Sequence, residues 1–233
     1  MNANLPENVI DLPELRDRVR VFRDRTHAGE VLASILEPHA TIAPMVVAIP
    51  AGGAPVAKEL AARLNLPLDI AVVSKITLPW NTEIGYGAVA FDGTVRLNRE
   101  LVHRVGLTEE EIQQGIDLTS SKVMRRAKKL RGNRALPDFS FHPAILVDDG
   151  LASGFTMRVA VEALSKCGAA DTIVAVPTGH LHTVERIAGE VKRLYCANIR
   201  GGRSFAVADA YQRWADVVEE ELSLILANGP DKG

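Results

Sequence analysis

Cysteine is scarce in this chain, which has two in 233 residues. A small secreted scaffold held together by disulfides needs more, so that class is excluded and a reducing compartment is expected. Aromatic residues are also few, at 5%. Positive and negative charges are nearly balanced, because the chain has 27 Lys and Arg and 29 Asp and Glu, which gives a net charge of −2. A protein held to nucleic acid mainly by bulk positive charge is therefore not expected.

Long apolar runs are absent as well. No segment reaches the roughly 20 consecutive apolar residues that a membrane-spanning helix needs. The nearest is the uncharged run 41–57, in which Pro44, Pro50 and Pro55 would break a helix. Residues 1–11 lack the basic start and apolar core of a signal peptide. We therefore expect a cytoplasmic protein without a membrane partner.

What the chain does have is an alternation of short β-branched runs with stretches of helical periodicity. Strands are expected at 45–49, 70–74, 88–91, 94–97, 144–148, 172–176 and 193–196, and helices at 54–64, 108–131, 155–167, 183–191 and 208–226. A capping box of Thr108 and Glu111 would open one helix, and Gly168 would end another in a left-handed cap. The pattern predicts an α/β fold with a mostly parallel sheet flanked by helices on both faces, in a single domain over 1–233.

The far end of the helix expected at 108–131 carries a run of bases with no acid among them, which continues to Arg134. They are Lys122, Arg125, Arg126, Lys128, Lys129, Arg131 and Arg134. One interpretation is an anion- or RNA-binding patch. The other is a helix whose acids come first and whose bases come last, which complements its dipole. We favour the second because the run has no aromatic residues on which bases could stack.

The clearest chemical signal is a strand that ends in two carboxylates and opens into a loop of small residues. Asp148 and Asp149 end the strand, Gly150-Leu151-Ala152-Ser153-Gly154 form the loop, and Phe155-Thr156 begin a helix. Small residues let backbone N–H groups approach an anion, and the helix N-terminus adds partial positive charge. The loop therefore predicts a phosphate site, and the carboxylates suit sugar hydroxyls or a hydrated Mg²⁺. The alternative is an acidic strand end followed by an ordinary helix cap.

This segment resembles the phosphoribosyl diphosphate (PRPP) binding motif of type I phosphoribosyltransferases. The stretches 48–57 and 74–89 are similar to a poorly characterised bacterial and archaeal branch of that superfamily, and the likeness runs from about residue 22 to about residue 221. The resemblance implies a type I phosphoribosyltransferase-like fold. It also implies a small hood contributed by about 12–36 and 198–226, and a mobile hairpin or loop over about 76–97.

The resemblance also implies roles for single residues. Asp148 and Asp149 would bind the ribose hydroxyls, directly or through Mg²⁺. Residues 150–156 would hold the 5-phosphate. Ala51, Gly52 and Gly53, in a loop shaped by a non-proline cis peptide in relatives, would cradle pyrophosphate with their backbone N–H groups. Lys75, expected at a strand end, would neutralise the charge of the pyrophosphate.

Two places depart from this pattern or match it weakly. The branch usually carries Arg where Ala51 stands, so a charged contact to pyrophosphate is missing. The stretch 203–211 is similar to the loop of purine-salvage transferases in which an aromatic residue stacks on the base, and Phe205 is the candidate. Core packing is the alternative for Phe205. We expect Asp209 to be an acid at a helix N-terminus. We expect Trp214 to pack on the last helix.

The function that the resemblance implies is a Mg²⁺-dependent phosphoribosyltransferase. It would bind PRPP, transfer ribose 5-phosphate to an unidentified acceptor, a nitrogenous base, and release pyrophosphate. The alternative is a non-catalytic regulator on the same fold that senses PRPP or a nucleotide, which Ala51 favours. A homo-oligomer is also compatible with the chain, with the helix at 108–131 as a contact.

Overall fold

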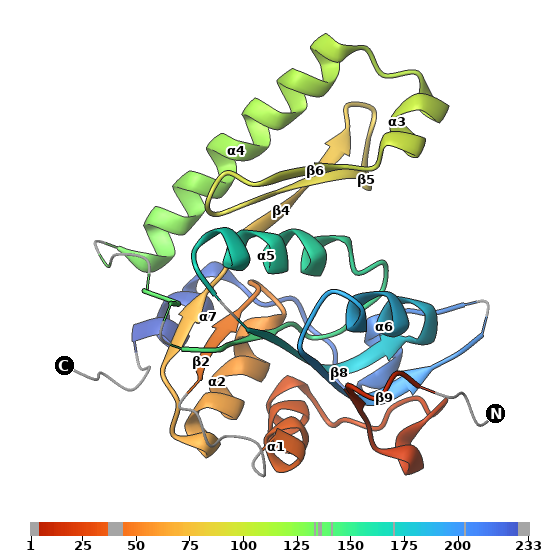
Figure 1. Cartoon of the computed structure of the whole chain (residues 1–233), viewed down its shortest axis with the longest axis vertical. Coiled ribbons are helices and arrows are strands. Elements are labelled where there is room, and N and C mark those ends of the chain that lie inside the picture. Colours follow the sequence, from red (N-terminus) through yellow and green to blue (C-terminus); the bar gives the residue numbers. More distant parts are fainter. Residues whose placement is uncertain are drawn as a thin grey trace.

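A six-stranded parallel sheet forms the body of the molecule, and a three-stranded antiparallel sheet stands beside it (Figure 1). The computed structural model describes residues 5–36, 44–132, 134, 137–140, 142–169, 171–202 and 204–227. In spatial order the large sheet contains β1 (Val9–Ile10), β9 (Arg193–Arg200), β8 (Thr172–His180), β7 (Ala144–Val147), β2 (Met45–Ala48) and β3 (Leu68–Ile70). Every pair of neighbours in it is parallel, as predicted.

Helices cover both faces of this sheet, which confirms the predicted layering. They are α1 (Arg25–Leu36) and α2 (Gly53–Leu64) on one face, and α5 (Phe155–Lys166) and α6 (Leu181–Ala188) on the other. Side chains alternate between the two faces along each strand. In β2, Val46 packs in the core with α1 and α2, whereas Val47 packs in the core with α5 and α6. Burial on both faces explains why these strands are continuously apolar.

The antiparallel sheet and two helices form an appendage to the body (Figure 1). Its elements are β4 (Val73–Leu78), β5 (Asn81–Ala90), β6 (Val95–Leu97), α3 (Arg99–Val105) and α4 (Glu109–Arg131). The capping box of α4 is present, with the Glu111 N–H donating to Thr108 Oγ1 at 3.2 Å and the Thr108 N–H donating to Glu111 Oε2 at 2.9 Å. The strands β5 and β6 form an antiparallel pair, and the turn between them contains Asp92-Gly93.

The strand predicted at 70–74 is wrong in one respect, because the chain divides there between two sheets. β3 ends at Ile70 in the large sheet, and β4 begins at Val73 in the small one. Arg131, at the end of α4, donates to the Ile70 carbonyl at 2.7 Å and to Asp69 Oδ1 at 3.3 Å. That contact anchors the appendage where the chain leaves the large sheet.

The single helix predicted at 208–226 is also wrong. A short 3₁₀ helix, η3 (Val207–Ala210), is followed by extended chain and then by α7 (Glu219–Ala227). The Gln212 and Arg213 N–H groups donate to the carbonyls of Phe22 and Arg23, at 2.8 and 2.9 Å. Backbone groups that a helix would use internally are thus paired with another segment. Gly168 does take the predicted left-handed conformation, at φ +94°.

The remaining short element is η1 (Pro13–Leu15), and the N-terminal segment that contains it packs along the end of β9. Asn198 of β9 holds this segment by donating to the carbonyls of Leu15 and Arg18, at 2.5 and 3.2 Å. No helix among the described residues is both long and apolar enough to cross a membrane.

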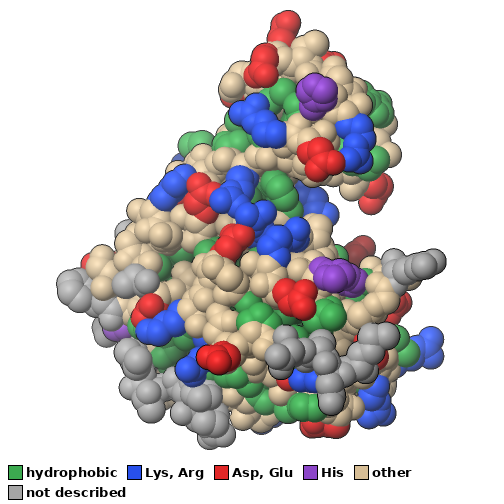
Figure 2. All heavy atoms as spheres, turned by 45° about the vertical axis from the view of Figure 1, so that its right-hand side comes forward, with side chains coloured by type: hydrophobic (Ala, Val, Ile, Leu, Met, Phe, Trp, Pro, Cys, Tyr) green, Lys and Arg blue, Asp and Glu red, His purple; other side chains and the backbone are tan. Residues whose placement is uncertain are grey.

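Three bases near the end of α4 form ion pairs with acids elsewhere in the chain. Arg126 lies 2.7 Å from Glu219 of α7, Lys129 lies 3.7 Å from the same carboxylate, and Arg131 pairs with Asp69. Figure 2 shows Lys and Arg side chains across the neck of the molecule with Asp and Glu interspersed among them. The ion pairs of Arg126, Lys129 and Arg131 favour the structural interpretation of the basic run.

Candidate functional site

The candidate site lies where the strand order of the large sheet reverses. From β2 the chain moves outward to β3, whereas from β7 it moves the other way through β8 to β9, so β2 and β7 are neighbours that wind in opposite directions. Open α/β sheets bind ligands beyond the carboxyl ends of the strands at such a point. The loops that leave β2 and β7 are the two that the sequence singled out. We call them the β2–α2 loop (residues 49–52) and the β7–α5 loop (residues 148–154).

The two loops are in direct contact, and the contact requires glycine. A Cβ atom on Gly52 would lie 1.9 Å from Asp149 Oδ2, and one on Gly53 would lie 2.6 Å from the Val147 carbonyl oxygen and 2.8 Å from Asp148 Cα. Because any side chain would collide there, both glycines are needed for this approach. The sequence had assigned them only to a pyrophosphate cradle.

The β2–α2 loop has the shape that the resemblance implied. The peptide bond between Pro50 and Ala51 is cis. The Gly53 N–H donates back to the Ile49 carbonyl at 3.1 Å. The N–H groups of Ala51 and Gly52 have no hydrogen-bond partner among the described residues, so they are available to a ligand.

The two carboxylates are partly buried and act on each other. The Asp149 N–H donates to Asp148 Oδ1 at 2.8 Å. Burial, and then the charge of Asp149, hold the pKa of Asp148 well above its usual range. Burial also raises the pKa of Asp149, against the opposing charge of Arg25. A pair of desolvated carboxylates favours a ligand that brings a cation or hydrogen-bond donors.

Arg25 and Tyr211, to which the sequence assigned no role, hold Asp149 in place, and Trp214 packs against Arg25. Arg25 Nε donates to Asp149 Oδ2 at 3.0 Å, and Arg25 Nη2 forms an ion pair with the same oxygen at 2.9 Å. Its guanidinium carbon lies 3.9 Å from the centre of the Trp214 ring. The Tyr211 hydroxyl donates to the Asp149 carbonyl oxygen at 2.7 Å. Arg25 is 124 residues away in sequence, and no local pattern connects it to Asp149.

Trp214 differs from the expectation that it packs on the last helix. It lies in the extended segment between η3 and α7, and 41% of it is exposed. The same segment and the first turn of α1 line a cavity of about 550 Å³. Its walls are residues 24–26, Pro55, residues 212–217 and Glu221. Parts of the hood that the resemblance implied, over about 12–36 and 198–226, therefore lie together here.

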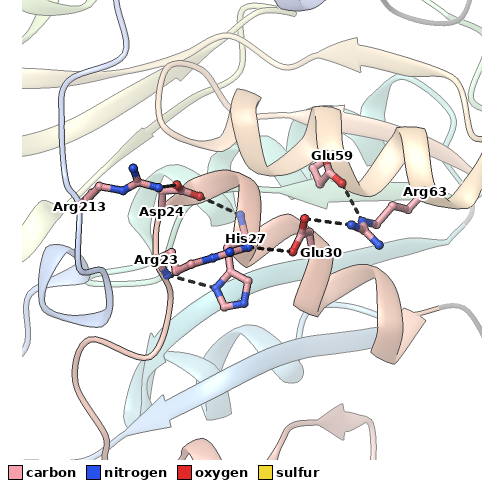
Figure 3. A network of polar contacts seen from close by, with 7 residues as sticks. All are labelled: Arg23, Asp24, His27, Glu30, Glu59, Arg63 and Arg213. Carbon is pink, nitrogen blue, oxygen red and sulfur yellow. Dashed lines mark hydrogen bonds and ion pairs between the residues drawn. The ribbon is translucent and has the colours of Figure 1, made fainter.

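A polar network fixes the start of α1, and with it Arg25 (Figure 3). Asp24 caps α1 by accepting from the His27 N–H at 3.0 Å, and it also pairs with Arg213. Farther along, Arg63 of α2 lies 2.9 Å from Glu30 and 2.7 Å from Glu59. These contacts attach α1 both to α2 and to the segment that carries Trp214.

The β7–α5 loop presents a row of free N–H groups. Leu151 is buried and forms two backbone bonds to β8, from its N–H to the Thr178 carbonyl at 2.8 Å and to its own carbonyl from the His180 N–H at 3.0 Å. The next three N–H groups, of Ala152, Ser153 and Gly154, have no partner among the described residues. They precede α5, for which Gly154 is the N-cap at φ +67°. This is an arrangement that can bind an anion.

Lys75 lies elsewhere in its strand than predicted. It is in the middle of β4, paired with Ala88, rather than at a strand end, and its side chain is exposed. Its methylene groups lie against Gly85, where an added Cβ would meet Lys75 Cδ at 3.2 Å. It thus belongs to the appendage and not to the large sheet. Its role toward pyrophosphate stays a prediction.

Phe205 is half-buried and has two ring neighbours. The Arg200 guanidinium carbon lies 4.6 Å from the centre of the ring, and the His180 ring lies 5.6 Å away, edge-on. Asp209 pairs with Arg200 at 3.2 Å, so it serves as a partner of that arginine. Phe205 therefore lies beyond the ends of β8 and β9, and stacking on a base stays a prediction for it.

The donor set at the site suits one kind of metal binding only. Among the described residues no three His, Cys, Asp or Glu side chains gather to hold a metal ion. Mg²⁺ commonly keeps several waters and uses one or two carboxylates together with substrate phosphates. Asp148 and Asp149 fit that mode, as ligands that need a bound phosphate ester to complete the shell.

Fold and site together define a parallel α/β protein with glycine-dependent loops and paired carboxylates at its switch point. The family model described as "Phosphoribosyl transferase domain" matches residues 26–210. The chain belongs to the phosphoribosyl transferase family. The crystal structure of TT1426 from Thermus thermophilus is similar, with a TM-score of 0.70 and 32% identity over 88% of this chain and 97% of that one.

Curated relatives from Mycobacterium tuberculosis are also similar. The proteins of strains CDC 1551 and H37Rv are 32% identical over 208 residues, which is 89% of this chain and 47% of theirs. Both are described, provisionally, as phosphoribosyl transferases. The chain spans about half the length of these relatives.

Proposed function

We propose that the chain is a PRPP-dependent phosphoribosyltransferase that transfers ribose 5-phosphate to a nitrogenous base and releases pyrophosphate. One observation carries the proposal. The β2–α2 loop and the β7–α5 loop each offer free N–H groups, and they meet at Gly52 and Asp149. PRPP has a phosphate and a pyrophosphate on one ribose, so two anion-binding loops with carboxylates between them suit its shape.

Each part of the site has a task in this reaction. The N–H groups of residues 152–154 bind the 5-phosphate, those of Ala51 and Gly52 bind pyrophosphate, and Asp148 and Asp149 accept hydrogen bonds from the ribose hydroxyls. The bond between C1 of the ribose and a pyrophosphate oxygen breaks, and its electron pair leaves with that oxygen. A nitrogen of the base bonds to C1 and gives up its proton. Positioning and fixed dipoles supply most of the rate, because no nucleophile of the protein is needed.

Mg²⁺ would be held by Asp148 and Asp149 together with the substrate, and it would neutralise charge on the departing pyrophosphate. Ala51 supplies no positive side chain there. Two other positive side chains are candidates: Lys75, which would have to reach the site from β4, and Arg25, which is paired with Asp149.

Calorimetry with PRPP and Mg²⁺ tests the proposal. Binding is expected for the unchanged chain and is expected to be lost in the double variant D148N/D149N. The control double variant, D138N/D171N, removes the same charge from residues outside the site and should bind as before. Absence of PRPP binding by the unchanged chain would refute the proposal.

A non-catalytic PRPP or nucleotide sensor is the second candidate. It is favoured by Ala51, and by Arg25, which already occupies Asp149 Oδ2. Pyrophosphate release, measured with PRPP and a panel of purine and pyrimidine bases, separates the two. Release with any base supports the enzyme, whereas binding without release from any base supports the sensor.

A further inference from the structure

We propose that Thr183 and Arg186 of α6 are positioning residues for the β7–α5 loop. They hold carbonyl oxygens of the loop, and so orient and polarise the N–H groups that would meet a phosphate. The inference rests on the proposed function, which assigns that loop to a phosphate. It concerns two residues that lie outside every motif of the sequence.

Three successive carbonyl oxygens of the loop, those of Leu151, Ala152 and Ser153, accept hydrogen bonds from residues of β8 and α6. The Leu151 carbonyl accepts from the His180 N–H at 3.0 Å. The Ala152 carbonyl accepts from Thr183 Oγ1 at 2.6 Å. The Ser153 carbonyl accepts from Arg186 Nη2. Three successive peptide groups therefore point their oxygens toward β8 and α6.

The opposite ends of these peptide groups are the free donors. In a trans peptide the carbonyl and the following N–H point in opposite directions. The Ala152 carbonyl shares its peptide group with the Ser153 N–H, and the Ser153 carbonyl shares its peptide group with the Gly154 N–H. Fixing the oxygens on α6 thus turns the N–H groups away from α6. This accounts for the row of unpartnered donors at the start of α5.

The same contacts strengthen the donors. A hydrogen bond accepted by a carbonyl polarises its peptide group, and this strengthens the bond that the attached N–H donates by about 10–30%. The guanidinium of Arg186 adds a full positive charge on the far side of the Ser153–Gly154 peptide. Arg186 forms no ion pair with any residue in the described part of the chain, so no carboxylate offsets that charge.

Thr183 also sets the shape of the loop. It is buried, and a Cβ added to Gly154 would lie 2.5 Å from Thr183 Cγ2. The left-handed turn at Gly154 therefore fits closely against α6. One side chain fixes both the Ala152 carbonyl and the turn that begins α5.

Substitution of Arg186 tests the inference, because that residue is exposed and its loss should leave the fold intact. We expect R186Q to bind ribose 5-phosphate and inorganic phosphate about fivefold more weakly, the scale of a charge acting at a helix N-terminus. R186K should recover part of the loss. The control R158Q removes a nearby arginine that pairs with Glu190 at 2.6 Å, and it should stay within about twofold of the unchanged chain.

A second readout needs no ligand. In the NMR spectrum of the ligand-free chain, the Gly154 amide proton is expected to move upfield in R186Q and to stay in place in R158Q. An unmoved Gly154 resonance, or equal weakening of binding in R186Q and R158Q, would overturn the inference. If the unchanged chain binds neither ribose 5-phosphate nor phosphate, the proposed function fails, while the Gly154 resonance still decides whether Arg186 polarises the loop.

Discussion

At the scale of single residues, the site depends on groups that are unfavourable for stability. Asp148 and Asp149 are carboxylates in a desolvated position, with pKa values raised by burial. Gly52 and Gly53 are glycines at the beginning of a helix, kept because nothing larger fits. Such residues are expected where function and stability oppose each other.

Replacing Asp148 by Asn is expected to stabilise the fold. A carboxyl group with a raised pKa in the folded state destabilises the fold once it loses its proton. The free energy of unfolding therefore falls as the pH rises from the pKa of the unfolded state, about 3.9, to the pKa of the folded state. D148N removes that penalty and can still accept from the Asp149 N–H. Urea unfolding in metal-free buffer should therefore find D148N more stable than the unchanged chain at pH 7, with the gain disappearing below about pH 3.9.

The comparison variant for that experiment is D138N. The N–H and hydroxyl of Ser140 lower the pKa of Asp138, so its substitution should not stabilise at pH 7. A D148N protein that is less stable than the unchanged chain at pH 7 would contradict the burial argument.

Gly52→Ala is expected to damage both stability and binding. The added methyl group would overlap Asp149 Oδ2 at 1.9 Å, so the two loops must separate. Overpacking of this kind costs about 1–3 kcal/mol. Thermal unfolding and PRPP calorimetry measure the two effects. Gly189→Ala is the matched control, because its φ is −69° and its added Cβ would meet nothing nearer than 3.6 Å.

At the scale of elements, local signals in the sequence placed most helix starts. The capping box at Thr108 and Glu111 located α4, and the apolar run before Asp148 located β7. Local signals failed where a distant segment took the backbone bonds. The segment after Tyr211 has helical periodicity, yet its N–H groups pair with Phe22 and Arg23, and the helix begins only at Glu219.

The α4 cap gives a test at this scale. Thr108→Ala removes the side chain that accepts from the Glu111 N–H and should lower the free energy of unfolding by about 1 kcal/mol. Ser121→Ala, in the exposed middle of the same helix, should change it by less than about 0.5 kcal/mol. Urea unfolding at neutral pH compares the two. An equal effect of both substitutions would show that the cap does not stabilise α4.

At the scale of the whole molecule, the appendage is tied to the body by ion pairs and by packing. α4 contacts α7 through Arg126 and Lys129 and contacts the end of β3 through Arg131. α5 lies between the large sheet and the antiparallel sheet, in contact with both. Three bases of the run, Arg126, Lys129 and Arg131, thus contact acids within the chain, which favours the structural interpretation.

RNA binding tests that interpretation. With three of its bases engaged, the run should give only weak binding in a filter assay, at the non-specific level of about 10⁻⁴ M or weaker at physiological salt. Glu219→Gln frees Arg126 and Lys129 and should steepen the salt dependence. Tight RNA binding by the unchanged chain, falling strongly with salt, would contradict the structural interpretation.

The amino-acid sequence alone predicted the parallel α/β architecture and the two loops that carry the candidate site. It could do so because both loops are local: each is a strand end, a few small residues and a helix start within a dozen positions.

The contacts that complete the two loops form only in the folded chain. Arg25 and Tyr211 come from opposite ends of the chain to Asp149, and Trp214 packs on Arg25. Thr183 and Arg186 reach the β7–α5 loop from α6. Such contacts depend on how the helices pack on the sheet and on where the segments near the two ends of the chain lie. No spacing along the chain encodes them, so these contacts with the candidate site could be found only in the folded chain.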